Sequence, residues 1–245
     1  MLIDSLHHPD WNSLTERVRN LNRIAILTGA GISAESGLAT FRSNGLWENH
    51  RVEDVATPEA FERDPKFVWR FYNMRREGVF KALPNDGHRA LVELEAKSQS
   101  FAIITQNVDG LHQLAGSQNV IELHGSIRRV RCTECSKKFE THETLTDEPM
   151  CKCGSMLRPD IVWFGEMLPE NAILDARRAT ENCDLFLVIG TSAVVHPAAG
   201  LIVQARNAGA FVIEVNPAQT EATALAHAVL RGPAAIMLPN LVSRL

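Results

Sequence analysis

The stretch Gln106-Asn107-Val108-Asp109-Gly110-Leu111-His112 directly follows a short apolar run, Phe101 to Thr105, of the kind that forms a buried strand. Two other stretches have the same arrangement. Gly29-Ala30-Gly31-Ile32-Ser33 comes after the run 24–27, and His124-Gly125 comes after the run 120–123. In an open α/β sheet, ligands bind beyond the carboxyl ends of the strands. Three strands would therefore bring polar or glycine-rich loops to one edge, which predicts a small-molecule site.

The remaining apolar runs favour a parallel sheet. Residues 183–189 and 211–215 are almost continuously apolar, as expected for parallel strands covered on both faces. They end in Gly190-Thr191-Ser192 and Asn216-Pro217, which are again polar or turn-forming. Helical spacing of apolar residues covers 11–21, 58–82 and 88–97, with a turn at 85–87. This alternation predicts an α/β fold with a Rossmann-like, doubly wound parallel sheet.

Glycines after the first strand are typical of a nucleotide-binding turn. Gly29 and Gly31 allow close backbone approach to a phosphate, and a following helix N-terminus favours its negative charge. The third glycine of the usual dinucleotide fingerprint is displaced to Gly37, so this motif alone is weak support for a dinucleotide.

Composition is that of a soluble globular protein. The 245 residues suit one large domain or a domain with a small appendage, and 45% hydrophobic residues suffice for a core. A net charge of −4 argues against nucleic-acid binding through a broad basic face. The N-terminus has neither the basic start nor the apolar run of a signal peptide, and no stretch approaches a membrane span. We expect a cytoplasmic protein, a monomer, without membrane or nucleic-acid partners.

Four of the five cysteines predict a zinc site. Cys132 and Cys135 form one pair of ligands, and Cys151 and Cys153 form another after an intervening fifteen residues. Four thiolates close a tetrahedron, so the zinc would be structural, one per chain. A disulfide pair is the alternative, disfavoured in a reducing compartment. Cys183 is expected to be a buried core thiol, and His142 a surface residue.

The zinc segment, about 128–160, interrupts the strand and helix alternation, and residues 42–84 form a second, helical insertion. We expect a large Rossmann-like lobe at about 10–41, 85–127 and 168–245. The small lobe would comprise about 42–84, which is helical, and 128–167, which binds zinc. The two insertions would pack beside each other and leave a cleft against the sheet.

These motifs occur in the order seen in sirtuins, the NAD-dependent protein lysine deacylases. The resemblance includes Gly29 to Ser33, Thr40-Phe41-Arg42, Gln106 to Asp109, His124-Gly125, the four cysteines, Val162-Trp163-Phe164-Gly165-Glu166, Gly190 to Ser192 and Asn216-Pro217. It runs from about residue 20 to residue 240. Any one motif would be weak, but eight in order are very specific.

The resemblance implies a reaction in which an acyl-lysine carbonyl oxygen attacks C1′ of the nicotinamide ribose and nicotinamide leaves. A base then activates a ribose hydroxyl, and lysine and O-acyl-ADP-ribose are released. His124 matches the base, since an imidazole can take a proton near neutral pH. Without the family, a lone histidine at a strand end is more often structural. Asn107 and Asp109 match residues that orient the ribose and the nicotinamide amide, although both types are also common in turns.

Binding residues are also implied by the resemblance. Phe41 would shield the reaction centre from water, unless it is simply a core residue, and Arg42 would lie near the phosphates. The extended segment 162–166 would pair with the substrate peptide, or could be an ordinary edge strand. His112 is expected in a helix after the catalytic loop, without a chemical role. The residues implied to bind NAD are Gly29, Ala30, Gly31, Ile32, Ser33, Phe41, Arg42, Gln106, Asn107, Val108, Asp109, Gly190, Thr191, Ser192, Asn216, Pro217, Ala218 and Ala234.

Within the family, Ala56-Thr57-Pro58 and Tyr72-x-x-Arg75 resemble the subgroup that removes succinyl and malonyl groups. Tyr72 and Arg75 are three apart on a predicted helix and share a face. An arginine matches a carboxylate in bidentate fashion, and Ala56 would leave room for a longer acyl chain. Taken alone, Arg75 and Arg76 look like a solvated helix face. The residues implied to bind substrate are Ala56, Tyr72, Arg75, Val162, Trp163, Phe164, Gly165 and Glu166.

Three other functions remain open from the residues. The chain could be an NAD-dependent protein ADP-ribosyltransferase, a non-catalytic NAD-sensing zinc protein, or an NAD oxidoreductase. The displaced third glycine and the insertions disfavour the oxidoreductase, and a binding protein would leave His124 and the Asn107–Asp109 loop unused.

Overall fold

All five predicted apolar runs form strands of one parallel sheet in the computed structural model, which describes residues 1–40 and 50–245. They are β2 (Arg23–Thr28), β3 (Ser100–Thr105), β4 (Val120–Glu122), β8 (Leu185–Ile189) and β9 (Phe211–Val215). Two short strands that the pattern did not indicate, β1 (Leu2–Ile3) and β10 (Ala228–Leu230), extend one edge. The order β1-β10-β9-β8-β2-β3-β4 gives seven strands, which confirms the doubly wound sheet.

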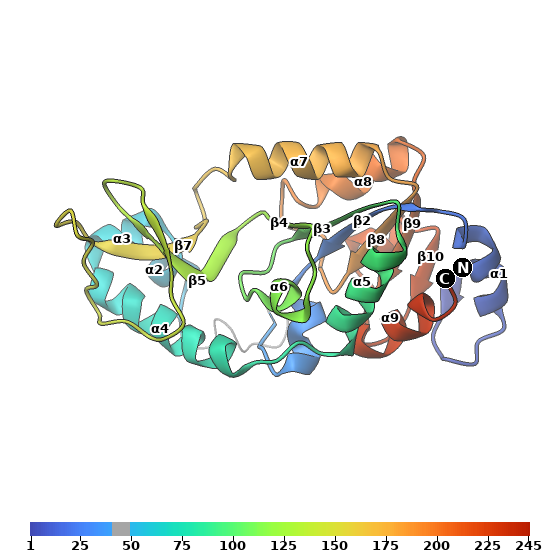
Figure 1. Cartoon of the computed structure of the whole chain (residues 1–245), viewed down its shortest axis with the longest axis horizontal. Coiled ribbons are helices and arrows are strands. Elements are labelled where there is room, and N and C mark those ends of the chain that lie inside the picture. The colour runs from blue at the N-terminus through green and yellow to red at the C-terminus, as the bar shows by residue number, and fades with distance from the viewer. Residues whose placement is uncertain (41–49) are drawn as a thin grey trace.

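Helices cover both faces of this sheet (Figure 1). On β2, Ile24 and Ile26 point to one face, and Ala25 and Leu27 to the other. The first face packs against α1 (Asp10–Val18), α5 (Asp86–Lys97) and α9 (Ala234–Val242). The second packs against α7 (Glu170–Glu181) and α8 (Gly200–Asn207). Because side chains on both faces of the sheet are buried, the strands have continuous apolar sequences.

Local signals set the helix boundaries. The helix expected over 11–21 is α1, which ends at Val18. The region 58–82 forms α3 (Pro58–Arg63) and α4 (Pro65–Lys81), each with proline in its first turn and a side-chain cap from Thr57 or Asp64. The expected turn at 85–87 is only partly correct, because Asn85 is the N-cap of α5 and the helix already begins at Asp86.

The two insertions form a small lobe at one end of the molecule, opposite the chain termini (Figure 1). One contributes α2 (Val52–Val55), α3 and α4. The other contributes β5 (Gly125–Cys132), β6 (Lys138–Glu140) and β7 (Leu157–Ile161), an antiparallel sheet ordered β6-β5-β7. The Trp69 indole N–H donates to the Leu157 carbonyl at 2.9 Å, which joins α4 to β7. The two insertions therefore contact each other.

Strand order reverses between β2 and β8, which are neighbours at the centre of the sheet. The chain leaves β2 toward β3 on one side and leaves β8 toward β9 on the other. The crevice at such a switch point is where doubly wound sheets bind ligands. Here the loops after Thr28 and Ile189 meet, and β4 leads past His124 directly into β5 of the small lobe (Figure 1).

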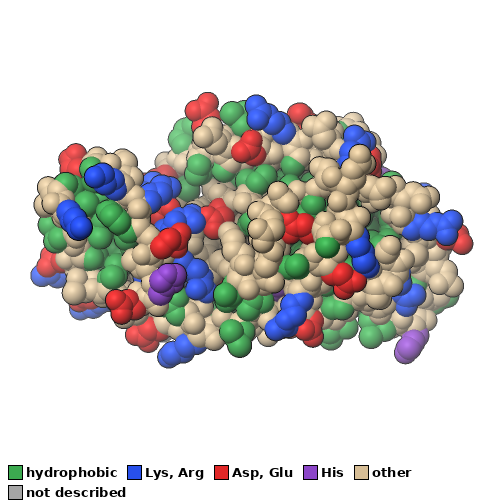
Figure 2. Space-filling view, viewed as in Figure 1, with side chains coloured by type: hydrophobic (Ala, Val, Ile, Leu, Met, Phe, Trp, Pro, Cys, Tyr) green, Lys and Arg blue, Asp and Glu red, His purple; other side chains and the backbone are tan. Residues whose placement is uncertain are grey.

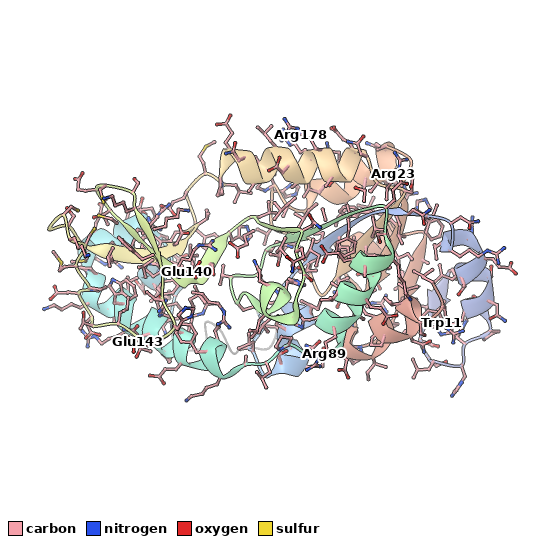
Figure 3. The ribbon with its side chains drawn as sticks, viewed as in Figure 1. Trp11, Arg23, Arg89, Glu140, Glu143 and Arg178 are labelled. Atoms are coloured by element: carbon pink, nitrogen blue, oxygen red, sulfur yellow. The ribbon has the colours of Figure 1, made fainter. Side chains whose placement is uncertain are left out.

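Acidic and basic side chains are interspersed over the face shown in Figure 2, consistent with the small net charge of −4. Arg23 and Arg178 lie toward the large-lobe end in Figure 3, and Glu140 and Glu143 lie on the small lobe. None of the helices in the described part of the chain is long and apolar enough to cross a membrane.

Candidate active site

Hydrogen bonds fix the loop that follows β3. The backbone N–H of Asn107 donates to the Thr105 hydroxyl at 3.0 Å, and the N–H of Leu111 donates to Asp109 Oδ1 at 2.9 Å. Gly110, with φ of 72°, begins α6 (Leu111–Ala115) in a left-handed conformation that suits glycine. His112 is on this helix as expected. The loop is therefore a rigid platform.

The loop is joined to the turn after β2 through Ser33. The Ser33 hydroxyl donates to Asp109 Oδ2 at 2.8 Å, and the Asn107 side-chain amide donates to the Gly29 carbonyl at 3.2 Å. Burial is the main cause that raises the pKa of Asp109, while the bonds from Leu111 and Ser33 oppose the rise. Asn107 and Asp109 are thus more than turn residues, because their side chains tie two loops together.

His124 lies at the end of β4 with one ring nitrogen already committed. Its Nδ1 is 2.9 Å from the Gln106 carbonyl, which can only accept, so Nδ1 carries the proton and Nε2 is left as a base. Desolvation by burial lowers the pKa of His124 and outweighs the bond to Gln106, which raises it. The imidazole is therefore neutral at pH 7, the form that a general base requires.

The glycines after β2 and β8 lie where two loops touch. The N–H groups of Gly29 and Gly31 donate to the carbonyls of Ile189 and Gly190, so they do not face a phosphate. A Cβ added to Gly31 would lie 2.6 Å from the Gly190 Cα, and one added to Gly29 would lie 2.8 Å from the Thr191 Cβ. They permit the two loops to touch. Gly37, the displaced third glycine, ends a short 3₁₀ helix, Ala30–Ser36.

Several residues implied to bind NAD gather around Thr191. The Gln106 amide donates to the Thr191 hydroxyl at 3.0 Å, and the Asn216 amide donates to the Thr191 carbonyl at 2.9 Å. The Ala218 N–H is 3.4 Å from Asn216 Oδ1. Ala234 is farther along the chain, buried at the start of α9. Phe41 and Arg42 lie outside the described residues.

The residues expected to bind the acyl group lie in the core of the small lobe. Tyr72 and Trp163 are buried there, and the Trp163 indole N–H donates to the Tyr72 hydroxyl oxygen at 2.8 Å. The Arg75 guanidinium lies 5.8 Å from the centre of the Tyr72 ring. Ala56 is buried and its carbonyl accepts from the Phe164 N–H at 3.0 Å. Ala56, Tyr72 and Trp163 thus belong to one core cluster, and Arg75 lies against the Tyr72 ring.

The segment 162–166 is less extended than expected. The strand ends at Ile161, and after Val162, which bonds the His124 carbonyl, the chain turns at Gly165 with φ of 88°. The edge-strand alternative is therefore wrong. Glu166 accepts from Arg158 at 2.6 Å, from Arg131 at 3.0 Å and from the Trp163 N–H at 2.8 Å. These bonds hold Glu166 to the turn itself.

The four thiols expected to bind zinc converge beside β5. Their sulfur atoms all lie within 4.8 Å of one another, with Cys132 to Cys153 at 3.4 Å and Cys135 to Cys151 at 3.8 Å. Zinc–sulfur bonds of about 2.3 Å in a tetrahedron place sulfurs about 3.8 Å apart, so the donor set fits zinc. Among the described residues, His142 is exposed and Cys183 is buried in the large lobe, and neither belongs to the cluster.

Removing the metal should destabilise the small lobe. We expect a chelator, or Cys132→Ala, to lower the melting temperature by about 10 °C or more and to promote aggregation, because a structural zinc contributes several kcal/mol of folding free energy. Differential scanning fluorimetry with zinc quantified in parallel measures this. Cys183→Ala is the control that should retain zinc. An unchanged melting temperature in metal-free protein would give the thiols another role.

One residue at this site was not anticipated. Arg128 of β5 donates from Nε to the Asp109 carbonyl at 2.7 Å and from its terminal nitrogen to the Val79 carbonyl at 3.1 Å. It thereby connects the loop after β3 to α4, the helix that carries Tyr72 and Arg75. The sequence offers no sign of this, since Arg128 stands among other arginines in a segment assigned to zinc binding.

Comparisons with known proteins agree on one family. The model of the Sir2 family matches residues 29–197. An NAD-dependent protein deacylase of Thermus thermophilus is 51% identical over 234 residues, covering 91% of this chain and 92% of the relative. A Sir2 homologue solved as an NAD complex superposes with a TM-score of 0.91 at 46% identity, covering 98% of this chain and 94% of the other. A Sir2-homologue mutant bound to 2′-O-acetyl ADP ribose has a TM-score of 0.89 at 48% identity, covering 94% of each chain.

Proposed function

Since this chain belongs to the Sir2 family and is an NAD-dependent protein deacylase, we propose that it removes succinyl and malonyl groups, as well as acetyl, from protein lysine. The products would be lysine, nicotinamide and O-acyl-ADP-ribose. A structure of a relative with 2′-O-acetyl ADP ribose supports that product class.

In this proposal His124 is the general base. NAD supplies the ribose that receives the acyl group, and His124 Nε2 takes the proton from its hydroxyl. Three observations support the assignment. The Gln106 carbonyl fixes the tautomer of His124, and burial keeps its ring neutral. The loop after β3 holds Asn107 and Asp109 beside Ser33. Gln106, Thr191 and Asn216 would bind the remainder of NAD, and the turn 162–166 the substrate backbone.

The preference for acidic acyl groups rests mainly on Arg75. It is partly buried, burial lowers its pKa, and within residues 1–40 and 50–245 no carboxylate oxygen lies within 4.0 Å of it. The other nearby arginine of α4, Arg76, instead donates to the Ile127 and Glu143 carbonyls. A cation withdrawn from water without an anionic partner is costly, and a ligand carboxylate would offset that cost.

Tyr72 adds a donor to the same place. Its hydroxyl oxygen accepts from Trp163, so its own proton can be donated to a second group. Burial raises the pKa of Tyr72, which keeps this proton in place at neutral pH. A carboxylate at the end of an acyl chain would thus meet a guanidinium and a hydroxyl from one helix.

A steady-state comparison on one peptide tests the proposal. Acetyl-, malonyl-, succinyl- and butyryl-lysine versions would be assayed with NAD, following O-acyl-ADP-ribose by mass spectrometry. Butyryl has the same number of carbons as succinyl but no carboxylate. We expect succinyl to exceed butyryl by about tenfold or more in kcat/KM, the effect of one charged hydrogen-bond pair. Equal kcat/KM values for succinyl- and butyryl-lysine would rule out the preference for acidic acyl groups. Transfer of ADP-ribose from NAD to protein would favour ADP-ribosylation.

We also propose that the enzyme works as a monomer in the cytoplasm, without nucleic acid. Four free thiols in an arrangement that could hold a metal suit a reducing compartment, and mixed surface charge offers no broad basic face. Light scattering of the purified protein would test the monomer.

A further inference from the structure

Arg158 of β7 is a buried cation that lies over an aromatic ring. Its guanidinium carbon is 3.4 Å from the centre of the Trp163 ring, and the residue is 8% exposed. The other arginine–ring distances in the described ranges 1–40 and 50–245 are 4.9 Å or more. Tryptophan is the strongest aromatic partner for a cation, so this contact holds the Trp163 ring in place.

Glu166 fixes the plane of that guanidinium. Arg158 donates to the two Glu166 oxygens at 2.6 and 2.9 Å, and to the Ile161 carbonyl at 3.0 Å. The same carboxylate accepts from the Trp163 N–H at 2.8 Å. Because a guanidinium is planar and pairs with a carboxylate through a fork, the two bonds set its orientation. The Trp163 ring is therefore held by Arg158, while its backbone is held by Glu166.

The position of Arg158 is costly for a group that only packs. Burial is the main cause that lowers its pKa, while the bond to Glu166 opposes this. Its Nε is buried without a hydrogen-bond partner in the part of the chain that the structure describes. A buried ion pair is often no better for stability than apolar residues of similar volume, so stability alone does not account for Arg158. Holding a ring in one orientation is a role that an apolar residue would not fill.

The far end of Trp163 carries this orientation to Tyr72. The indole N–H donates to the Tyr72 hydroxyl oxygen at 2.8 Å, and an indole N–H can only donate. Both residues are buried, with exposed fractions of 3% and 1%. The direction of this bond leaves the Tyr72 proton free for a second acceptor.

We propose that Arg158 is a positioning residue for the choice of acyl group. It fixes the Trp163 ring, Trp163 fixes the direction of the Tyr72 hydroxyl, and that hydroxyl donates to a carboxylate at the end of the acyl chain. The last step rests on the preference for acidic acyl groups proposed above, whereas the first two steps are properties of the protein without substrate.

Tyr72 is the single tyrosine among the 245 residues, so the tyrosine bands of a Raman spectrum report on its hydroxyl alone. The Fermi doublet of a phenol distinguishes a hydroxyl that accepts a hydrogen bond from one that only donates. We expect the accepting pattern in wild type and its loss in Arg158→Met, because the indole is then free to rotate. A wild-type hydroxyl that only donates, or an unchanged doublet in the variant, would overturn the proposal.

Arg131→Met is the matched control. Arg131 also bonds Glu166, at 3.0 Å, but within the described residues it lies over no aromatic ring, so its removal should leave the doublet unchanged. Arg158→Lys keeps the positive charge but not the planar face, so it should resemble Arg158→Met. A control that changes as much as Arg158→Met, or a lysine variant with the wild-type doublet, would assign the effect to charge beside Glu166 and contradict the proposal.

Kinetics test the last step with succinyl- and butyryl-lysine versions of one peptide. We expect Arg158→Met to lower kcat/KM for succinyl-lysine by about tenfold and for butyryl-lysine by less than about threefold. Arg131→Met should leave the ratio of the two values unchanged. Equal losses for both peptides would make Arg158 a general support of the turn 162–166 and contradict its role in selection. A wild type without a preference for succinyl-lysine would instead refute the proposed function, and the Raman doublet would still decide whether Arg158 orients Trp163 and Tyr72.

Discussion

His124→Ala should lower turnover by about 10²–10⁴, the usual contribution of a positioned general base, while NAD and peptide still bind. The side chain is partly buried at the end of β4, and its removal deletes the free Nε2 together with the Nδ1 bond to the Gln106 carbonyl, whereas the Ser33–Asp109 bond does not involve it. Single-turnover rates, with binding measured by calorimetry, distinguish the two steps. Turnover near that of wild type would exclude His124 from the chemistry.

The pH profile provides a second measurement of the same group. Because burial lowers the pKa of His124, its base form persists below pH 6.5. We expect the midpoint of the acid limb, where kcat/KM decreases with falling pH, to lie below pH 6.5. His124→Ala should lose that limb. A limb that remains in the variant would belong to another residue.

Arg75→Met should lower kcat/KM for succinyl-lysine by about 10² or more, equivalent to roughly 3 kcal/mol for a lost charged hydrogen-bond pair. Methionine keeps an apolar stem but removes the cation. Acetyl-lysine has no carboxylate and should change by less than about tenfold. The deciding quantity is the ratio of the two kcat/KM values in wild type and variant.

Two further variants control this experiment. Arg70→Met removes an exposed arginine of the same helix, which pairs with Asp147 on the surface, and should leave the ratio unchanged. Tyr72→Phe should shift the ratio in the same direction as Arg75→Met but less, since it removes only one hydroxyl. If Arg75→Met lowers both activities equally, Arg75 supports the fold or the cofactor instead of selecting the acyl group.

Most of the large lobe could be predicted from sequence because central parallel strands bury both faces. This environment requires apolar residues at successive positions, and β2, β3, β8 and β9 show the resulting runs. Strands β1 and β10 were missed because two or three residues carry no detectable period. Pairing with a neighbouring strand stabilises them: β1 pairs with β10, and β10 pairs with β9.

The sequence named residues that the fold brings together, but not the contacts among them. Family motifs located His124, Asp109 and the four cysteines, since these types are rare in such combinations. They could not show that Arg76 is fully buried against the Ile127 carbonyl, because arginine is usually exposed. Nor could they place the His88 ring beside that of His112, because the two are distant in sequence and meet only when α5 packs beside α6.

The contact between Gly31 and Gly190 has a consequence for redesign of the enzyme. A side chain at either position would meet the backbone of the other, and Gly190 adds a φ of 60° that disfavours other residues. The obstacle is main chain, so no second substitution can make space for the first. Attempts to redesign the loops after β2 and β8 would therefore leave this junction intact.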